Sequence, residues 1–79
     1  SNNRYPIKAE LSRSLASDKG REEYIPIRIF KENDKLMAEP LLGKSSLITN
    51  LVYGDAVLKI PRSQEGKNKG EVVELTLIE

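Results

Sequence analysis

The chain has 79 residues, with 13 Lys and Arg against 12 Asp and Glu, a net charge of +1, and no Cys, His or Trp. A chain this short forms one small domain, because its high surface-to-volume ratio leaves only a modest core. Without Cys and His it has no thiolate nucleophile, imidazole base, disulfide or zinc site of the usual kind. Any catalysis would have to rest on carboxylates, Lys, Arg or hydroxyl groups.

Charge and hydropathy also limit the partners. The two signs of charge are interspersed along the chain, so no concentrated field favours nucleic acid or an anionic membrane. No apolar run approaches the roughly 20 residues that span a bilayer. We therefore expect no membrane partner. The lack of Cys is compatible with a reducing cytosol but also occurs in many secreted domains, and we expect a cytoplasmic protein. Residues 1–6 are polar and begin Ser-Asn-Asn, so we interpret them as a linker or cloning scar before a domain over residues 7–79, excised from a larger multidomain protein.

The first half of the chain alternates apolar and polar residues, as strands do. We favour a strand over residues 7–11, although the spacing of Leu11 and Leu15 also fits a helix. A turn is expected to end at Gly20, and residues 24–31 form a strand with its three isoleucines on one face. Within that strand Pro26 cannot donate to a ladder, which places it at an edge or a bulge.

The remaining elements follow in order. A polar turn at residues 32–35 and a strand at 36–40 make a hairpin with the preceding strand. The spacing of the apolar residues at 47–52 predicts a short helix, capped by one of the serines before it and ended by Gly54. Strands are expected at 56–60 and 72–77. They are joined by a solvated loop over 62–70, which has no hydrophobic residue.

These elements predict an all-β fold, a small β-barrel-like or β-clip domain with one short helical segment. Closing the sheet into a barrel would leave few unpaired strand edges. The expected core consists of the inward-facing apolar residues Ile25, Ile27, Ile29, Leu47, Ile48, Leu51, Val57, Leu58, Ile60, Val73, Leu75 and Leu77. So few side chains make the predicted stability marginal.

A short run before the expected helix is similar to a phosphate-binding element. It combines small residues with one cation: Gly43, Lys44, Ser45 and Ser46. The free amides of a helix N-terminus favour anions. The run lacks the second glycine and the spacing of a P-loop, which excludes that kind of nucleotide site. It is a candidate anion-binding segment, and a helix cap with a solvated lysine is the alternative.

Arg21 is the second candidate. It follows Gly20, which frees the backbone for a turn, and a guanidinium held there can bind a carboxylate or a phosphate. A surface arginine paired with a nearby acid is the plainer interpretation. The acidic pairs at positions 22–23 and at 32 and 34 predict no acid–base pair, since neighbouring strand residues point to opposite faces. We therefore expect no catalytic residue and no metal ligand in the domain.

Five short motifs follow one another along nearly the whole chain, from about Lys8 onward. In order they are Gly20-Arg21-Glu22 before a strand, Ala38-Glu39-Pro40-Leu41, Gly43-Lys44-Ser45-Ser46-Leu47-Ile48, Asp55 before an apolar strand ending in Ile60-Pro61, and Gly70-Glu71-Val72-Val73. Their order and intervals resemble the C-terminal domain (domain IV) of the MoeA/gephyrin family of molybdopterin molybdenumtransferases. Two departures are Ser46, where the family usually has glycine, and Gly54-Asp55-Ala56 in place of the usual Ala-Asp-Gly.

The resemblance implies a β-barrel-like domain at the end of an elongated multidomain protein that dimerises. It implies a parent enzyme, a molybdopterin molybdotransferase, that inserts molybdate into adenylylated molybdopterin with Mg²⁺, while this domain binds no cofactor itself. The implied partners are the other domains of the same chain and the α/β domain of a second subunit. Arg21 and the Ser45 segment would face the cleft between them, and the implied structural turns are Gly20, Gly43, Gly54 and Asp55.

We therefore expect a non-catalytic scaffold that forms one wall of the cleft in a molybdenum-insertion enzyme. The alternative, from a different class, is a stand-alone β-barrel interaction module that binds a protein or a nucleic acid. The coding region upstream separates the two hypotheses, because only the first requires a molybdopterin-binding α/β domain there.

Overall fold

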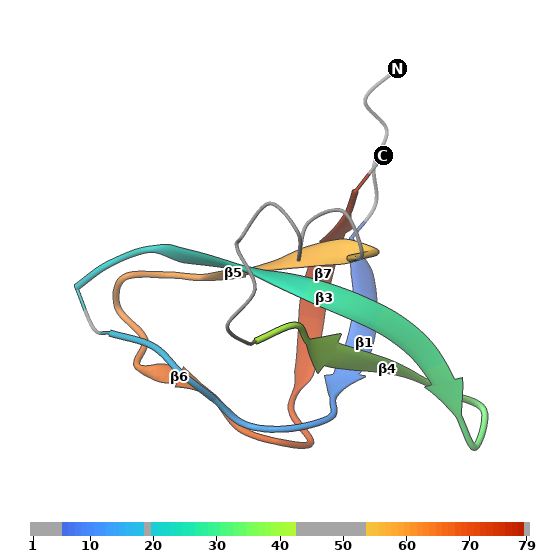
Figure 1. Cartoon of the computed structure of the whole chain (residues 1–79). Helices are drawn as coiled ribbons and strands as arrows, with labels where there is room; N and C mark the ends of the chain where they lie inside the picture. The colour runs from blue at the N-terminus through green and yellow to red at the C-terminus, as the bar shows by residue number, and fades with distance from the viewer. Residues whose placement is uncertain (1–5, 19, 43–53, 79) are drawn as a thin grey trace.

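The structure is a computed structural model that describes residues 6–18, 20–42 and 54–78. Every regular element in these residues is a strand: β1 (Ile7–Leu11), β2 (Leu15–Ala16), β3 (Glu23–Glu32), β4 (Lys35–Pro40), β5 (Ala56–Ile60), β6 (Gly66–Lys67) and β7 (Val72–Leu77). Five of them close into a barrel in the order β1-β4-β3-β5-β7, and β2 pairs with β6 in a separate two-stranded sheet. The all-β barrel is confirmed (Figure 1). The expected helix at 47–52 and its capping serines lie outside the described residues.

The hairpin between β3 and β4 sets the register of the barrel. Its two turn residues, Asn33 and Asp34, have φ angles of 51° and 64°, the left-handed conformation that two-residue hairpin turns require. Asn and Asp tolerate that conformation better than other residues with side chains. The ladder then runs without a break from Glu32↔Lys35 to Ile27↔Pro40, as the polar cluster at 32–35 predicted.

Pro26 lies in a strand with neighbours on both sides, because β3 pairs with β4 and with β5. It therefore does not mark a sheet edge. Its carbonyl oxygen accepts a hydrogen bond from the Leu41 amide at 2.9 Å. The N–H and C=O of one residue in an antiparallel strand face the same side, so the proline nitrogen also faces the β4 side, beyond Ile27↔Pro40, the last pair of that ladder. A missing donor is tolerated there.

The barrel interior is filled by side chains from all five of its strands. The strand alternation correctly predicted the burial of Ile27, Leu58, Ile60, Val73 and Leu75. The buried residues among those described are Ala9, Leu11, Leu15, Pro26, Ile27, Met37, Ala38, Pro40, Ala56, Leu58, Ile60, Val73 and Leu75. Ile25 and Ile29 pack against this core while remaining partly exposed.

Five other predicted core residues are either not buried or lie outside the described residues. Leu77 is 41% exposed, because it occupies the last position of β7 at the rim of the barrel. Val57 is only half-buried, since it alternates with buried Ala56 and Leu58 and points away from the interior. The predicted core residues at 47, 48 and 51 lie outside the described residues.

The second sheet, β2 with β6, extends beside the barrel, and we call it the arm (Figure 1). The prediction of a solvated loop over residues 62–70 is wrong at Gly66–Lys67, which forms a short, half-buried strand paired with Leu15–Ala16. Gly66 has a φ of 139°, and a Cβ on it would lie 2.0 Å from the Leu15 carbonyl oxygen. The two strands of the arm therefore approach each other through a position that only glycine can occupy.

Candidate functional site

Arg21 stands in a turn between the arm and the start of β3. The amide of Gly20, whose φ is 98°, donates to the Arg62 carbonyl at 2.8 Å, and the Arg21 amide donates to the Asp18 carbonyl at 3.3 Å. The Arg21 Nη2 atom lies 3.5 Å from Asp18 Oδ2 and 3.4 Å from Glu23 Oε2. The side chain is 67% exposed. The guanidinium is therefore a surface cation paired with two carboxylates, which was the plainer of the two interpretations.

Glu23 is held from a second direction as well. Its Oε1 atom accepts a hydrogen bond from the Ser17 hydroxyl, while Oε2 faces Arg21. Because Ser17 follows β2 and Glu23 begins β3, this contact ties the arm to the barrel at the turn. Arg21 retains further N–H donors, since a guanidinium carries five, so it can still bind an anion from solvent.

Asp55, which immediately precedes β5, forms hydrogen bonds to β3 and to the residue that follows β7. Its Oδ2 atom accepts the Ile29 amide at 2.7 Å. Its own amide donates to the Ile27 carbonyl at 2.7 Å, and its carbonyl accepts the Ile78 amide at 3.0 Å. The side chain thus continues the β3–β5 pairing one step past Ala56, where the main-chain ladder ends. It acts as a structural junction.

The structure does not bring Arg21 and Asp55 together. Glu23, the partner of Arg21, and Ile27, the partner of Asp55, are four residues apart on β3, which is about 13 Å at the rise of an extended strand. Gly54 is half-buried beside Asp55. The other predicted site residues, Gly43, Lys44, Ser45 and Ser46, lie outside the described residues, so their roles stay predictions.

A charged cluster on the outer face of β3 and β4 was not anticipated. Arg28 Nη2 lies 2.8 Å from Glu39 Oε1, and Arg13 Nη2 lies 3.6 Å from Glu39 Oε2. The Arg28 guanidinium also lies 5.9 Å from the centre of the Phe30 ring, within cation–π range. The hydrogen bond from Arg28, helped by the charges of both arginines, lowers the pKa of Glu39.

A sequence signal for this cluster did exist. A two-residue turn at 33 and 34 pairs residues whose numbers add to 67, so Arg28 must stand opposite Glu39, as the register shows. The approach of Arg13 from the end of β1 was not accessible in this way, because it depends on the parallel pairing of β1 with β4.

A third cluster lies on β3 and β5, where Tyr24 stands opposite Lys59. The Tyr24 hydroxyl donates to Glu22 Oε2 at 2.5 Å, and Lys59 Nζ lies 3.5 Å from Glu22 Oε1. The hydrogen bond from Tyr24, followed by the Lys59 charge, lowers the pKa of Glu22, and the same hydrogen bond raises the pKa of Tyr24. These shifts move both groups away from neutral titration.

The described residues show no sign of a buried polar site. Residues 6–18, 20–42 and 54–78 contain no group of three or more carboxylates arranged to hold a metal ion. In the same ranges, every buried side-chain nitrogen or oxygen has a hydrogen-bond partner. No helix within them is long and apolar enough to cross a membrane. The described polar side chains thus form ion pairs on an exposed barrel surface.

Comparison with known proteins decides the family. Residues 8–78 match the family described as the MoeA C-terminal region (domain IV). The chain belongs to the MoeA C-terminal domain family. It is 30% identical over 76 residues to a molybdopterin biosynthesis protein of Methanocaldococcus jannaschii, a match that spans 95% of this chain and 18% of the relative.

Solved structures of MoeA proteins have the same fold. The molybdopterin biosynthesis MoeA protein of Pyrococcus horikoshii superposes with a TM-score of 0.77 at 34% identity, over 99% of this chain and 20% of that protein. A molybdenum cofactor biosynthesis protein of Pyrococcus furiosus gives a TM-score of 0.78 at 26% identity, over 99% and 27% of the two chains. The MoeA C-terminal domain therefore corresponds to about a fifth to a quarter of these relatives.

Proposed function

We propose that this MoeA C-terminal domain is a non-catalytic scaffold and cleft wall in a protein that inserts molybdate into adenylylated molybdopterin. Family membership over residues 8–78 carries the proposal. The names of its relatives, which are molybdopterin and molybdenum cofactor biosynthesis proteins, support a role in the same biosynthetic pathway. In this proposal the catalytic groups belong to other domains of the parent chain and to a second subunit.

The surface chemistry of the barrel supports the scaffold role. The charged clusters at Arg21, Arg28 and Tyr24 are exposed ion pairs, and such pairs position surfaces more than they catalyse. In each cluster a surface carboxylate is paired with a cation. What the domain offers a substrate is shape and anion-binding donors.

The Mg²⁺ ion expected for the family does not fit the described part of this domain. Mg²⁺ binds through carboxylate and water oxygens in octahedral geometry, and the described ranges contain no suitable carboxylate group. We therefore assign the ion to the rest of the parent protein and derive no step of the reaction through it. Molybdate itself is a substrate in this proposal.

The proposal is tested with the full-length parent protein, molybdate and adenylylated molybdopterin. Deletion of residues 7–79 should abolish molybdate transfer, and the 79-residue chain alone should show none. Transfer by the 79-residue chain would contradict the scaffold role. Unchanged transfer by the deleted parent would contradict the role in the cleft.

A finer test addresses the anion-binding segment. Lys44→Ala and Ser45→Ala in the parent should each raise the KM for molybdate or for the pterin substrate several-fold, because each removes one donor to an anion. Lys31→Ala is the matched control, since Lys31 is an exposed lysine at the C-terminal end of β3. Equal kinetic constants in all three variants would contradict anion binding by Lys44 and Ser45 and favour the alternative, a helix cap with a solvated lysine.

A further inference from the structure

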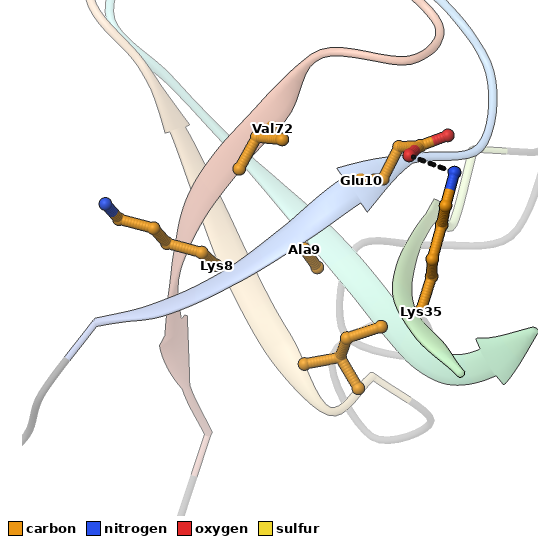
Figure 2. A pocket seen from close by; sticks show the side chains of 6 residues that line it. Lys8, Ala9, Glu10, Lys35 and Val72 are labelled. Carbon is orange, nitrogen blue, oxygen red and sulfur yellow. Dashed lines mark hydrogen bonds and ion pairs between the residues drawn. The ribbon is translucent and has the colours of Figure 1, made fainter.

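An open groove of ≈ 200 Å³ lies on the outside of the barrel, apart from the charged clusters (Figure 2). It follows the line along which β1 approaches β4, with β7 on its other side. Its lining combines apolar side chains with charged ones. The lining residues are Lys8, Ala9, Glu10, Lys35, Leu36 and Val72.

The groove exists because β1 and β4 separate. Their parallel ladder consists of two pairs, Glu10↔Met37 and Leu11↔Ala38. It stops on one side at Pro40, which has no N–H to donate. On the other side the two strands separate beyond Glu10↔Met37, so Lys8 has no partner on β4 in this ladder. The opening between the separated strands is the groove.

The main chain of Lys8 faces this opening. The Leu11 amide donates toward β7, to Glu71, and the Ser12 amide donates toward β4, to Ala38. Main-chain directions alternate along a strand, so the N–H and C=O of Lys8 point to the β4 side. They lie beyond Glu10↔Met37, the last pair of that ladder. A strand edge of this kind is a template for pairing with another segment.

The side chains of the groove also suit a contact surface. Val72 is 67% exposed, more than any other large hydrophobic residue among those described. It stands directly opposite Glu10, whose carboxylate lies 3.3 Å from Lys35 Nζ across the groove. Exposed apolar side chains beside charged ones suit a protein interface, whose apolar contacts are surrounded by polar groups.

We propose that the groove is the docking site for the part of the parent chain that precedes this domain. The proposal rests on the function proposed above only in requiring a longer MoeA-type parent. The matched family is the C-terminal region of proteins four to five times longer, so in such a parent the rest of the chain enters through β1. That strand begins at Ile7, immediately beside Lys8 and Ala9 in the groove.

The contacts expected of this occupant follow from the groove. An apolar side chain of the preceding domain packs on Val72 and Leu36, and an extended segment pairs with the main chain of Lys8. Because the occupant is tethered a few residues away, its effective concentration is high, and a modest interface is sufficient. Docking would then hold the domain in one orientation relative to the rest of the parent.

The test uses amide hydrogen exchange of the full-length parent, read at Lys8. Val72→Asp places a charge in the lining of the groove, and Thr76→Asp is the matched control on the same exposed face of β7. Val72→Asp should speed exchange of the Lys8 amide at least tenfold, whereas Thr76→Asp should leave it unchanged. In the 79-residue chain both variants should melt within a few degrees of the wild type, since both positions are exposed.

Two outcomes would overturn the proposal. Equal exchange at Lys8 in the parent and in both variants would show that nothing covers the groove. Protection that depends on protein concentration would show that a second copy occupies it instead. Neither readout requires molybdate transfer, so a parent that lacks transfer activity but protects Lys8 would contradict the proposed function and leave the docking site standing.

Discussion

The barrel and the arm are held together in different ways. The barrel has five strands, and its interior is filled by apolar side chains that alternate along them. The arm has two residues in each strand, and Leu15 is its one buried hydrophobic residue among those described. It depends instead on main-chain contacts, such as Ser17 to Glu65 at 2.9 Å, and on the close approach at Gly66. Side-chain pattern thus specifies the first region, and backbone conformation specifies the second.

The largest effect is expected in the barrel. Ile27→Ala removes a side chain with no exposed surface from the strand that pairs on both sides. It should lower the free energy of unfolding by about 2–5 kcal/mol, measured by urea denaturation, because it leaves a cavity. Ile27→Val should cost about 0.5–1.5 kcal/mol. Equal losses in the two variants would mean that cavity size does not govern this core.

The arm should be broken by a single methyl group. Gly66→Ala forces a Cβ against the Leu15 carbonyl at a strained φ, so we expect a loss greater than about 1 kcal/mol and faster exchange of the Ser17 amide, which donates to Glu65 across the arm. Gly70→Ala is the matched control. Gly70 has a φ of 91° with nothing within 4 Å of the added carbon, and only the strain of about 1 kcal/mol should remain. A larger loss at Gly70 than at Gly66 would contradict the close-approach argument.

The junction at Asp55 should give an intermediate effect confined to the barrel. Asp55→Ala leaves the Ile29 amide without its acceptor, which should cost about 1–2 kcal/mol. Asp55→Asn keeps a side-chain oxygen at the same place and should recover most of that loss. Exchange of the Ile29 amide, followed by NMR, distinguishes the two variants. Identical exchange in both would show that the carboxylate is not the acceptor in solution.

The smallest effect is expected on the barrel surface, at Arg28 and Glu39. The folded-state pKa of Glu39 is lowered, so its pairing stabilises the fold above the ordinary glutamate pKa and is lost as the pH falls through the folded value. Arg28→Ala should raise the pKa of Glu39 toward its usual range, as seen in a carboxyl NMR titration. The stability difference between the variant and the wild type should vanish at low pH. A difference that persists there would indicate lost packing on Phe30.

The sequence predicted the barrel better than the arm for a physical reason. Alternation at residues 56–60 defined a strand with the bounds that β5 has, since a buried face leaves a period of two. Gly66 and Lys67 leave no such trace, because a two-residue strand has no period and neither residue is buried. Alternation also cannot tell where a barrel ends, which is why Leu77 was assigned to the core.

The candidate site divides in the same way. Turn geometry at Gly20 was legible, because glycine before a strand marks a left-handed position. The partners of Arg21 were anticipated only as a class, a nearby acid, since Asp18 and Glu23 reach it from either side of that turn. Contacts between distant parts of the chain, such as Asp55 with Ile29, depend on strand order. Local sequence patterns do not predict the order of strands in a sheet.

The barrel also separates its own stability from the length of the chain between β4 and β5. That chain leaves at Leu41, bonded to Pro26, and returns at Asp55, bonded to Ile27, so its two ends are anchored at neighbouring residues of one strand. Doubling the length of a loop between such ends costs only about 0.6 kcal/mol in closure entropy. A change in the number of residues between Leu41 and Asp55 should therefore change the free energy of unfolding of the barrel only slightly.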